Sequence, residues 1–158
     1  MGKKLMNVLV FGGKELTGRR KTLIKKAVLI ALGSTAKRKG ELCVIFVPDR
    51  EIRRINSEYL GHDYATDVLS FPYLAPPPRQ KDDAPPFGDI YIARGVARAQ
   101  AKSLGHDELT EWLTLAVHGA LHLAGYDDRT KKEKERMFAR QNSIVRRIRP
   151  SSIDGKKK

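Results

Sequence analysis

Apolar residues in the first half of the chain alternate between short continuous runs and helical spacing. Residues 5–11 form an apolar run that ends at two glycines, whereas residues 19–37 carry apolar side chains every three or four positions. Residues 42–47 form a second run that ends at Pro48, and residues 50–59 again show helical spacing, with Asp49 placed to cap that helix. The pattern predicts strand, helix, strand, helix.

Two shorter apolar runs follow, at residues 67–71 and 89–92, and a long proline-rich loop separates them. Loops of this length are uncommon within compact domains and are either functional or disordered. If the two strands pair across the loop, this part of the sheet is antiparallel.

Helical spacing dominates the rest of the chain. We expect helices at residues 94–104, 107–124 and about 130–148, with breaks at Gly105 and Gly125. At 158 residues the chain fits one domain, which we assign to residues 1–150, and residues 151–158 are expected to form a basic, disordered tail.

Composition excludes several classes of protein. With 41% hydrophobic and 31% charged residues, the chain is typical of a globular domain and not of a disordered one. No run approaches the roughly 18 apolar residues of a membrane span, and no secretory signal is evident. The one cysteine, Cys43, is expected to be a small buried hydrophobic residue, and the chain is expected to be cytoplasmic.

Positive charge is concentrated near the C-terminus. The chain has a formal net charge of +13, and residues 129–158 contribute +9 of it, from 12 basic and 3 acidic residues. Such an excess favours binding to a polyanion, with nucleic acid ahead of a membrane surface.

The strongest chemical signal is a histidine pair on the predicted helix 107–124. His118 and His122 are four positions apart, so their imidazoles project from one face about 6 Å apart along the helix axis. A turn at Gly125 can bring Tyr126, Asp127 or Asp128 to the same face, and the spacing His-x3-His-x5-Asp favours Asp128. Two imidazoles and one carboxylate leave one position of a tetrahedral zinc open, as in catalytic zinc sites.

Three other interpretations compete with this one. Two histidines on an apolar helix can be core residues bonded to backbone, but the following glycine and aspartates favour a metal site. A metalloprotease would need a glutamate directly after the first histidine, where this chain has Gly119. A glycine spacing at residues 13–18 is similar to that of a P-loop but lacks its lysine and hydroxyl residue.

Three sequence blocks together resemble the bacterial YbeY family of endoribonucleases. They are residues 59–72 (YLGHDYATDVLSFP), residues 88–93 (GDIYIA) and residues 118–128 (HGALHLAGYDD). The resemblance implies a single-domain α+β fold, with a mixed sheet of about four strands packed by helices and a metal site on a central helix. It further implies one zinc ion, or another divalent metal, held by His118, His122 and Asp128.

The implied activity is metal-dependent, single-strand-specific hydrolysis of RNA during maturation of the 16S rRNA 3′ end and in ribosome quality control. The implied partners are small-subunit rRNA and the ribosome. Within the matching blocks, Asp89 is a candidate to orient a ligand histidine, or else a turn residue, and Ser70 is a candidate site residue or an ordinary strand hydroxyl.

The sequence departs from the family pattern in two places. The third metal ligand is usually histidine and is Asp128 here, and the residue after the motif tyrosine is usually arginine and is Leu60 here. Leucine supplies no positive charge for a phosphate. His62, Arg53 and Arg54 are candidate substitutes, with surface charge as the alternative for each. The rival function is a ribosome assembly or rRNA-binding factor with weak or no nuclease activity.

Overall fold

In the part of the chain that the structure describes, four strands form one mixed sheet in the order β1-β2-β4-β3. The computed structural model describes residues 5–73 and 84–149. Strands β1 (Met6–Phe11), β2 (Gly40–Val47) and β4 (Pro86–Ala93) are parallel, and β3 (Val68–Pro72) pairs antiparallel with β4 at the sheet edge. Both the strand count and the antiparallel pairing predicted from the sequence are confirmed.

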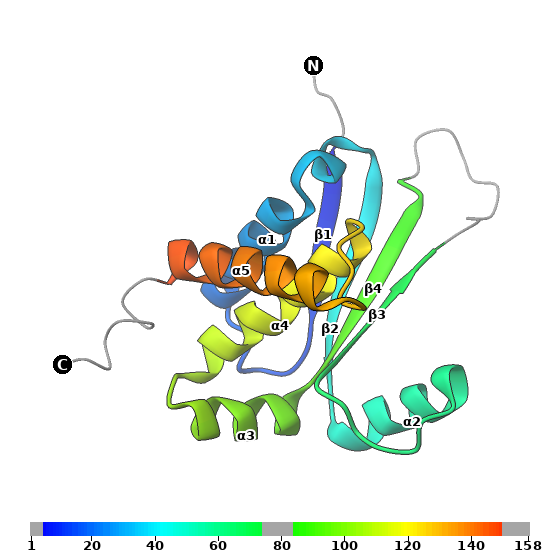
Figure 1. Cartoon of the computed structure of the whole chain (residues 1–158). Helices are drawn as coiled ribbons and strands as arrows, with labels where there is room; N and C mark the ends of the chain where they lie inside the picture. Colours follow the sequence, from blue (N-terminus) through cyan, green and yellow to red (C-terminus); the bar gives the residue numbers. More distant parts are fainter. Residues whose placement is uncertain (1–4, 74–83, 150–158) are drawn as a thin grey trace.

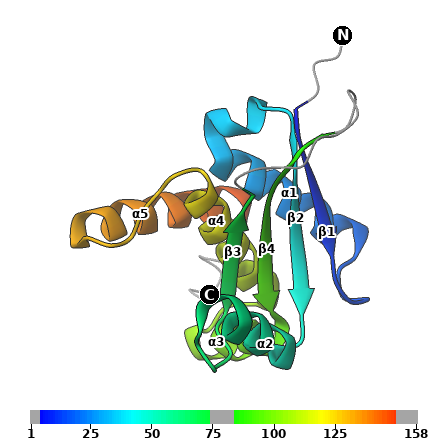
Figure 2. The ribbon, with the colours of Figure 1, turned by 90° about the vertical axis from the view of Figure 1, so that its right-hand side faces the viewer.

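Three helices cover one face of the sheet: α1 (Gly18–Leu32), α4 (Glu108–Leu123) and α5 (Lys131–Ile148), shown in front of the strands in Figure 1. Their apolar residues join those of the strands in one core. Helices α2 (Asp49–Leu60) and α3 (Arg94–Leu104) lie together at one end of the sheet (Figure 2). The fold is a single α+β domain, as the sequence predicted.

Helix α4 is the most deeply buried element, and a glycine allows it to approach the sheet closely. A Cβ atom at Gly119 would lie 2.9 Å from Cγ2 of Ile90 on β4, closer than such atoms pack. One turn further along, Leu123 covers Gly88 of the same strand, where a Cβ would lie 3.0 Å from its Cδ1. These two contacts fix the height of α4 above the sheet.

Two boundary predictions need correction. The helix predicted over residues 19–37 ends at Leu32, because Gly33 adopts a positive φ of 59° and a short 3-10 helix, Gly33–Lys37, follows. Asp49 does not cap its own helix. Its carboxylate accepts hydrogen bonds from the backbone N–H groups of Gly95 and Val96, at 2.9 and 3.1 Å, in the first turn of α3.

The topology explains why Asp49 caps a different helix. Strands β2 and β4 are parallel neighbours, so the helices that follow them begin side by side at the same sheet end. Pro48 occupies the cap position of α2, and the next residue therefore faces the free N–H groups of α3. A capping residue was recognisable from the sequence, but the helix it caps was not.

Cys43 is only partly buried, and the prediction of a buried residue was therefore wrong. The proline-rich loop and the basic tail lie largely outside the described residues, so their expected disorder stays a prediction. Within the described ranges, no helix combines the length and apolar character needed to cross a membrane.

We expect Gly119→Val to lower the free energy of unfolding by about 1–3 kcal/mol, because the side chain would collide with Ile90 in a packed core. Urea denaturation measures this. Gly18→Val is the matched control, since a Cβ at Gly18 meets nothing within 4 Å. Equal unfolding midpoints for the two variants would contradict the close-packing interpretation.

Candidate metal centre

Helix α4 presents His118 and His122 on one face, one turn apart. The helix begins at Asp107, whose side chain accepts a hydrogen bond of 2.8 Å from the backbone N–H of Thr110. The two imidazole rings are 4.7 Å apart between centroids and nearly perpendicular, at 82°. Both side chains are partly exposed, so they do not belong to the buried core of α4.

The chain reverses after α4 through a left-handed cap at Gly125. Gly125 has a φ of 105°, which favours glycine. Its N–H donates to the carbonyl of His122 at 3.0 Å, and the N–H of Tyr126 donates to the carbonyl of Leu121 at 2.9 Å. This pair of bonds is the Schellman motif, and the ring of Tyr126 packs on the core. The turn predicted at Gly125 is confirmed.

Asp127 shapes the next residues of the loop. Its carboxylate accepts hydrogen bonds from the N–H groups of Asp128 and Arg129, at 2.7 and 3.2 Å, and pairs with the Arg129 guanidinium at 2.6 Å. These bonds hold the pKa of Asp127 below its usual value, chiefly through Arg129. Asp127 is therefore engaged in the loop, and Asp128 is the carboxylate that faces the histidines.

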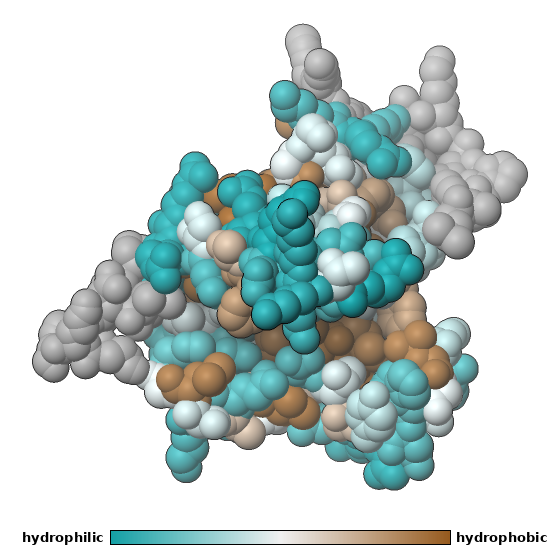
Figure 3. Space-filling model, viewed as in Figure 1, coloured by the Kyte–Doolittle hydropathy of each residue, from teal (hydrophilic) through white to brown (hydrophobic). Residues whose placement is uncertain are grey.

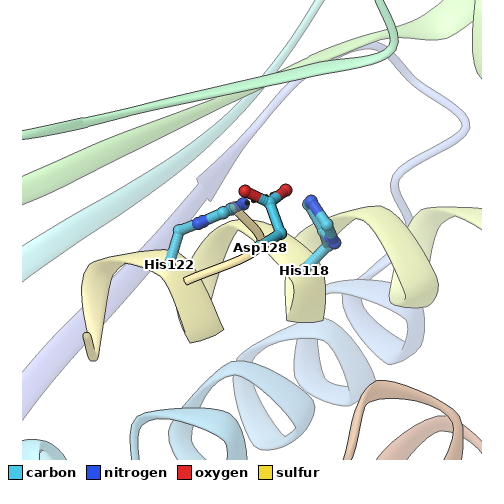
Figure 4. A group of neighbouring side chains, drawn as sticks. All are labelled: His118, His122 and Asp128. Atoms are coloured by element: carbon cyan, nitrogen blue, oxygen red, sulfur yellow. Dashed lines mark ion pairs between the residues drawn. The ribbon is translucent and has the colours of Figure 1, made fainter. Parts of the chain in front are cut away.

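Asp128 completes a cluster of three side chains, drawn in Figure 4. Its Oδ2 lies 3.5 Å from Nε2 of His122, and one potential ligand atom from each of the three residues lies within 4.8 Å of the others. Ligands of a tetrahedral zinc lie about 2.0–2.2 Å from the ion and hence roughly 3.4 Å from one another. The cluster fits one ion after a small contraction, with Asp128 exposed to solvent.

His118 is oriented by a residue that the sequence reasoning missed. Its Nδ1 lies 2.8 Å from Oε1 of Gln141 on α5, so the ring N–H donates to the amide oxygen and Nε2 is free to bind a metal. Burial lowers the pKa of His118, which favours the neutral imidazole. The missed signal was a polar residue at a buried position of α5, in phase with Met137 and Ile144.

A groove runs beside the cluster, between α4 and the edge strand β3. This pocket, of about 500 Å³, is lined by His118, Gly119 and His122 and by four residues of β3: Val68, Leu69, Ser70 and Pro72. Ser70 lines it too, so the structure brings this predicted residue close to the histidines. The edge position of β3 leaves the groove open to solvent.

The structure does not bring Asp89 to the histidines. The carboxylate accepts a hydrogen bond of 2.9 Å from the hydroxyl of Tyr73 and raises the pKa of that tyrosine to about 12. On β4, Asp89 lies between Gly88 and Ile90, and both of these neighbours face α4. Its side chain therefore points to the opposite face of the sheet.

The candidates for a phosphate-binding residue near Leu60 have other partners. His62 stacks on Tyr64 with ring centroids 5.5 Å apart. Arg53 pairs with Asp63 at 2.9 Å, and Arg54 pairs with Glu51 and Glu58. Leu60 itself is 48% exposed at the end of α2. The described contacts therefore join none of these residues to the histidine cluster.

Comparison with known proteins identifies the family of this chain. The sequence model described as "Endoribonuclease YbeY" matches residues 14–149, a range that includes His118, His122 and Asp128 and helices α1 to α5. The chain belongs to the YbeY endoribonuclease family. The resemblance noted from the three sequence blocks is thereby confirmed.

Two curated relatives cover most of the chain. A YbeY endoribonuclease of Elusimicrobium minutum is 48% identical over 130 residues, which are 82% of this chain and 90% of that protein. A YbeY endoribonuclease of Bacillus licheniformis is 40% identical over 149 residues, 88% and 94% of the two chains. The solution structure of TM1509 from Thermotoga maritima matches with a TM-score of 0.60 at 28% identity. The match covers 92% of this chain and 90% of that chain.

We expect Gln141→Leu to weaken binding of a divalent metal, with zinc as the probe, by about 10- to 100-fold, because His118 loses the acceptor that fixes its ring. Competition with a chromophoric chelator measures the affinity. Ser143→Leu, on the exposed side of the same helix, is the control and should bind zinc like the unmodified chain. Equal zinc affinities for the two variants would show that Gln141 does not orient the ligand.

Proposed function

We propose that this protein is a single-strand-specific, metal-dependent endoribonuclease that acts in 16S rRNA 3′ end maturation and ribosome quality control in the cytoplasm. The observation that carries the proposal is the convergence of His118, His122 and Asp128 beside an open groove. The chemistry of the three donors suits one zinc ion, and other divalent metals are alternatives for the same site.

The side chains have distinct tasks in this proposal. His118 and His122 hold the ion through ring nitrogens, and Asp128 adds a negative charge that a third histidine would not. When bound, a zinc ion supplies Lewis-acid chemistry, which polarises a phosphodiester and makes water a better nucleophile. Gln141 keeps the proton of His118 on Nδ1, and the groove between β3 and α4 admits the RNA strand.

Helix α5 supplies positive charge close to this centre. The loop before the helix and the exposed N-terminal half of the helix carry several basic side chains, visible as the hydrophilic surface across the centre of Figure 3. They include Arg129, Lys131, Lys132, Lys134 and Arg136. Contacts of this kind hold the phosphate backbone without reading sequence, which suits a single-stranded substrate.

Packing argues against peptide hydrolysis at this centre. A metalloprotease of the related motif needs a glutamate after its first histidine, and Gly119 holds that position against Ile90. A longer side chain there would collide with β4. The absence of the protease base is therefore a consequence of how α4 packs on the sheet.

A second candidate function rests on Leu60. The family pattern has an arginine at that position, and Leu60 brings no charge to a developing oxyanion. A ribosome assembly or rRNA-binding factor with weak or no nuclease activity would use the same basic surface of α5. Binding of small-subunit rRNA without cleavage in the presence of sufficient zinc would favour this alternative.

We expect His118→Ala and His122→Ala to lose bound metal and RNA cleavage together while the fold is kept, since both side chains are partly exposed. Elemental analysis of the purified variants, combined with a single-stranded RNA cleavage assay with and without chelator, measures both effects. Asp128→His, which restores the usual third ligand, is the companion variant and should retain the metal.

Each outcome separates the proposals. Full cleavage by a metal-free variant that lacks both histidines would rule out a catalytic role for this cluster. If the variants lose the metal but the unmodified, metal-loaded chain cleaves no RNA, the assembly-factor function would be the better account.

RNA binding should weaken steeply with salt, because it depends on counterion release by basic side chains. We expect Lys131→Ala, Lys132→Ala and Lys134→Ala each to reduce the slope of log affinity against log salt by up to about 0.7, the value for one contact with single-stranded nucleic acid. Arg50→Ala, on the exposed surface of α2, is the control. Unchanged slopes for all three variants would exclude this part of α5 as the contact surface.

A further inference from the structure

A second pocket adjoins the histidine cluster, towards the N-terminal half of α4. We call it the α3–α5 pocket, because it lies among the end of α3, α4, the second half of α5 and the start of β3. Its volume is about 620 Å³, within the range of small-molecule sites. His118 and Val68 line both this pocket and the groove, so the two cavities meet at the candidate metal centre.

Two buried polar atoms of the lining residues lack a hydrogen-bond partner in the described part of the chain. The amide of Gln100 is oriented by Asp67, to which its Nε2 donates at 3.2 Å, and its Oε1 is left without a donor. Thr110 is only 1% exposed, and its hydroxyl is likewise unpartnered. Unsatisfied buried groups of this kind are costly, and a ligand that carries N–H donors would satisfy the Gln100 oxygen.

Hydrogen-bond acceptors are prominent among the polar groups of the pocket. Asp67 and Glu111 both line it, and Glu111 is 3% exposed, with its Oε1 2.7 Å from Nε2 of His106. Arg146 lines the pocket as well, so its charges are mixed, while the two carboxylates and the amide oxygen keep it rich in acceptors. The amino group of a neutral ring would find partners among these acceptors.

Exposed apolar side chains flank the same pocket. Phe138 on α5 is 57% exposed and Leu104 at the end of α3 is 65% exposed, and both line it. In Figure 3, hydrophobic surface is visible in the recess between the hydrophilic surface of α5 and the lower part of the molecule. An exposed aromatic ring beside hydrogen-bonding groups is typical of sites where an unstacked base of single-stranded RNA binds.

We propose that the α3–α5 pocket binds one nucleobase of the single-stranded RNA, next to the phosphate held at the metal centre. The base stacks on Phe138, and its exocyclic amino group donates a hydrogen bond to Oε1 of Gln100. This inference rests on the proposed function and extends it, because it adds a preference for bases that carry an amino group. The phosphates on either side of this nucleotide remain outside the pocket, close to the basic residues at the start of α5.

The test measures equilibrium binding of fluorescent RNA hexamers to the zinc-loaded full chain, with a gel to verify that the hexamers stay intact. The probes are a hexamer of adenosine, one of purine riboside, which lacks the amino group, and one of abasic ribose phosphate. We expect the adenosine hexamer to bind most tightly. Phe138→Ala should weaken its binding about tenfold and leave binding of the abasic hexamer unchanged.

Two further variants distinguish stacking from hydrogen bonding and from the unspecific effect of losing an exposed phenylalanine. Gln100→Met keeps the length of the side chain and removes the amide, so we expect it to abolish the preference for adenosine over purine riboside. Phe11→Ala removes another exposed phenylalanine, 49% exposed at the end of β1, and should bind every hexamer like the unmodified chain. Circular dichroism verifies that each variant is folded.

Failure of this inference and failure of the nuclease proposal give different results. If the unmodified chain cleaves RNA but Phe138→Ala and Phe11→Ala bind all hexamers alike, the base-binding pocket is excluded and the nuclease remains. If Phe138→Ala weakens binding of the abasic hexamer to the same degree, the pocket is likewise excluded. If the base-dependent losses appear but no cleavage is detected, the pocket stands and catalysis does not.

Discussion

The contact between Gly119 and Ile90 is the constraint on which the rest of this structure depends. It lets α4 lie close to β4, so that the helix packs against α1, α3 and α5 while one strip of it faces the edge strand β3. His118 and His122 occupy that strip. Because β3 has a strand on only one side, the histidines face an open groove and not a closed core. If α4 lay further from the sheet, its histidines would no longer line the groove beside β3.

Around this contact, each side chain of the centre is held from a different part of the chain. The cap at Gly125 and the bonds of Asp127 bring Asp128 back over the last turn of α4, and Gln141 reaches His118 from α5. In the proposed metal centre, these neighbours would fix the ligand positions without binding the metal themselves. The two helices on either side of the loop therefore act as one unit in shaping the centre.

Charge differs between the start of α5 and the α3–α5 pocket. Basic residues at the start of α5 are exposed and suited to phosphates, whereas the pocket is lined by Asp67, Glu111 and Arg146 and holds the unpartnered oxygen of Gln100. The proposed single-stranded RNA has charged phosphates and neutral bases, which could follow these two surfaces separately. The net charge of +13 alone would not distinguish such a substrate from any other polyanion.

The sequence by itself determined the order of elements, the histidine spacing and the turn that returns Asp128, because these depend on local periodicity and on glycine at a positive φ. It also identified the family, through three blocks that lie within residues 59–128. Only the tertiary structure decided that Gln141 orients His118, that Asp49 caps α3 and that Asp89 faces away from the centre. Each of these depends on which distant elements become neighbours, and periodicity along one segment carries no information about that.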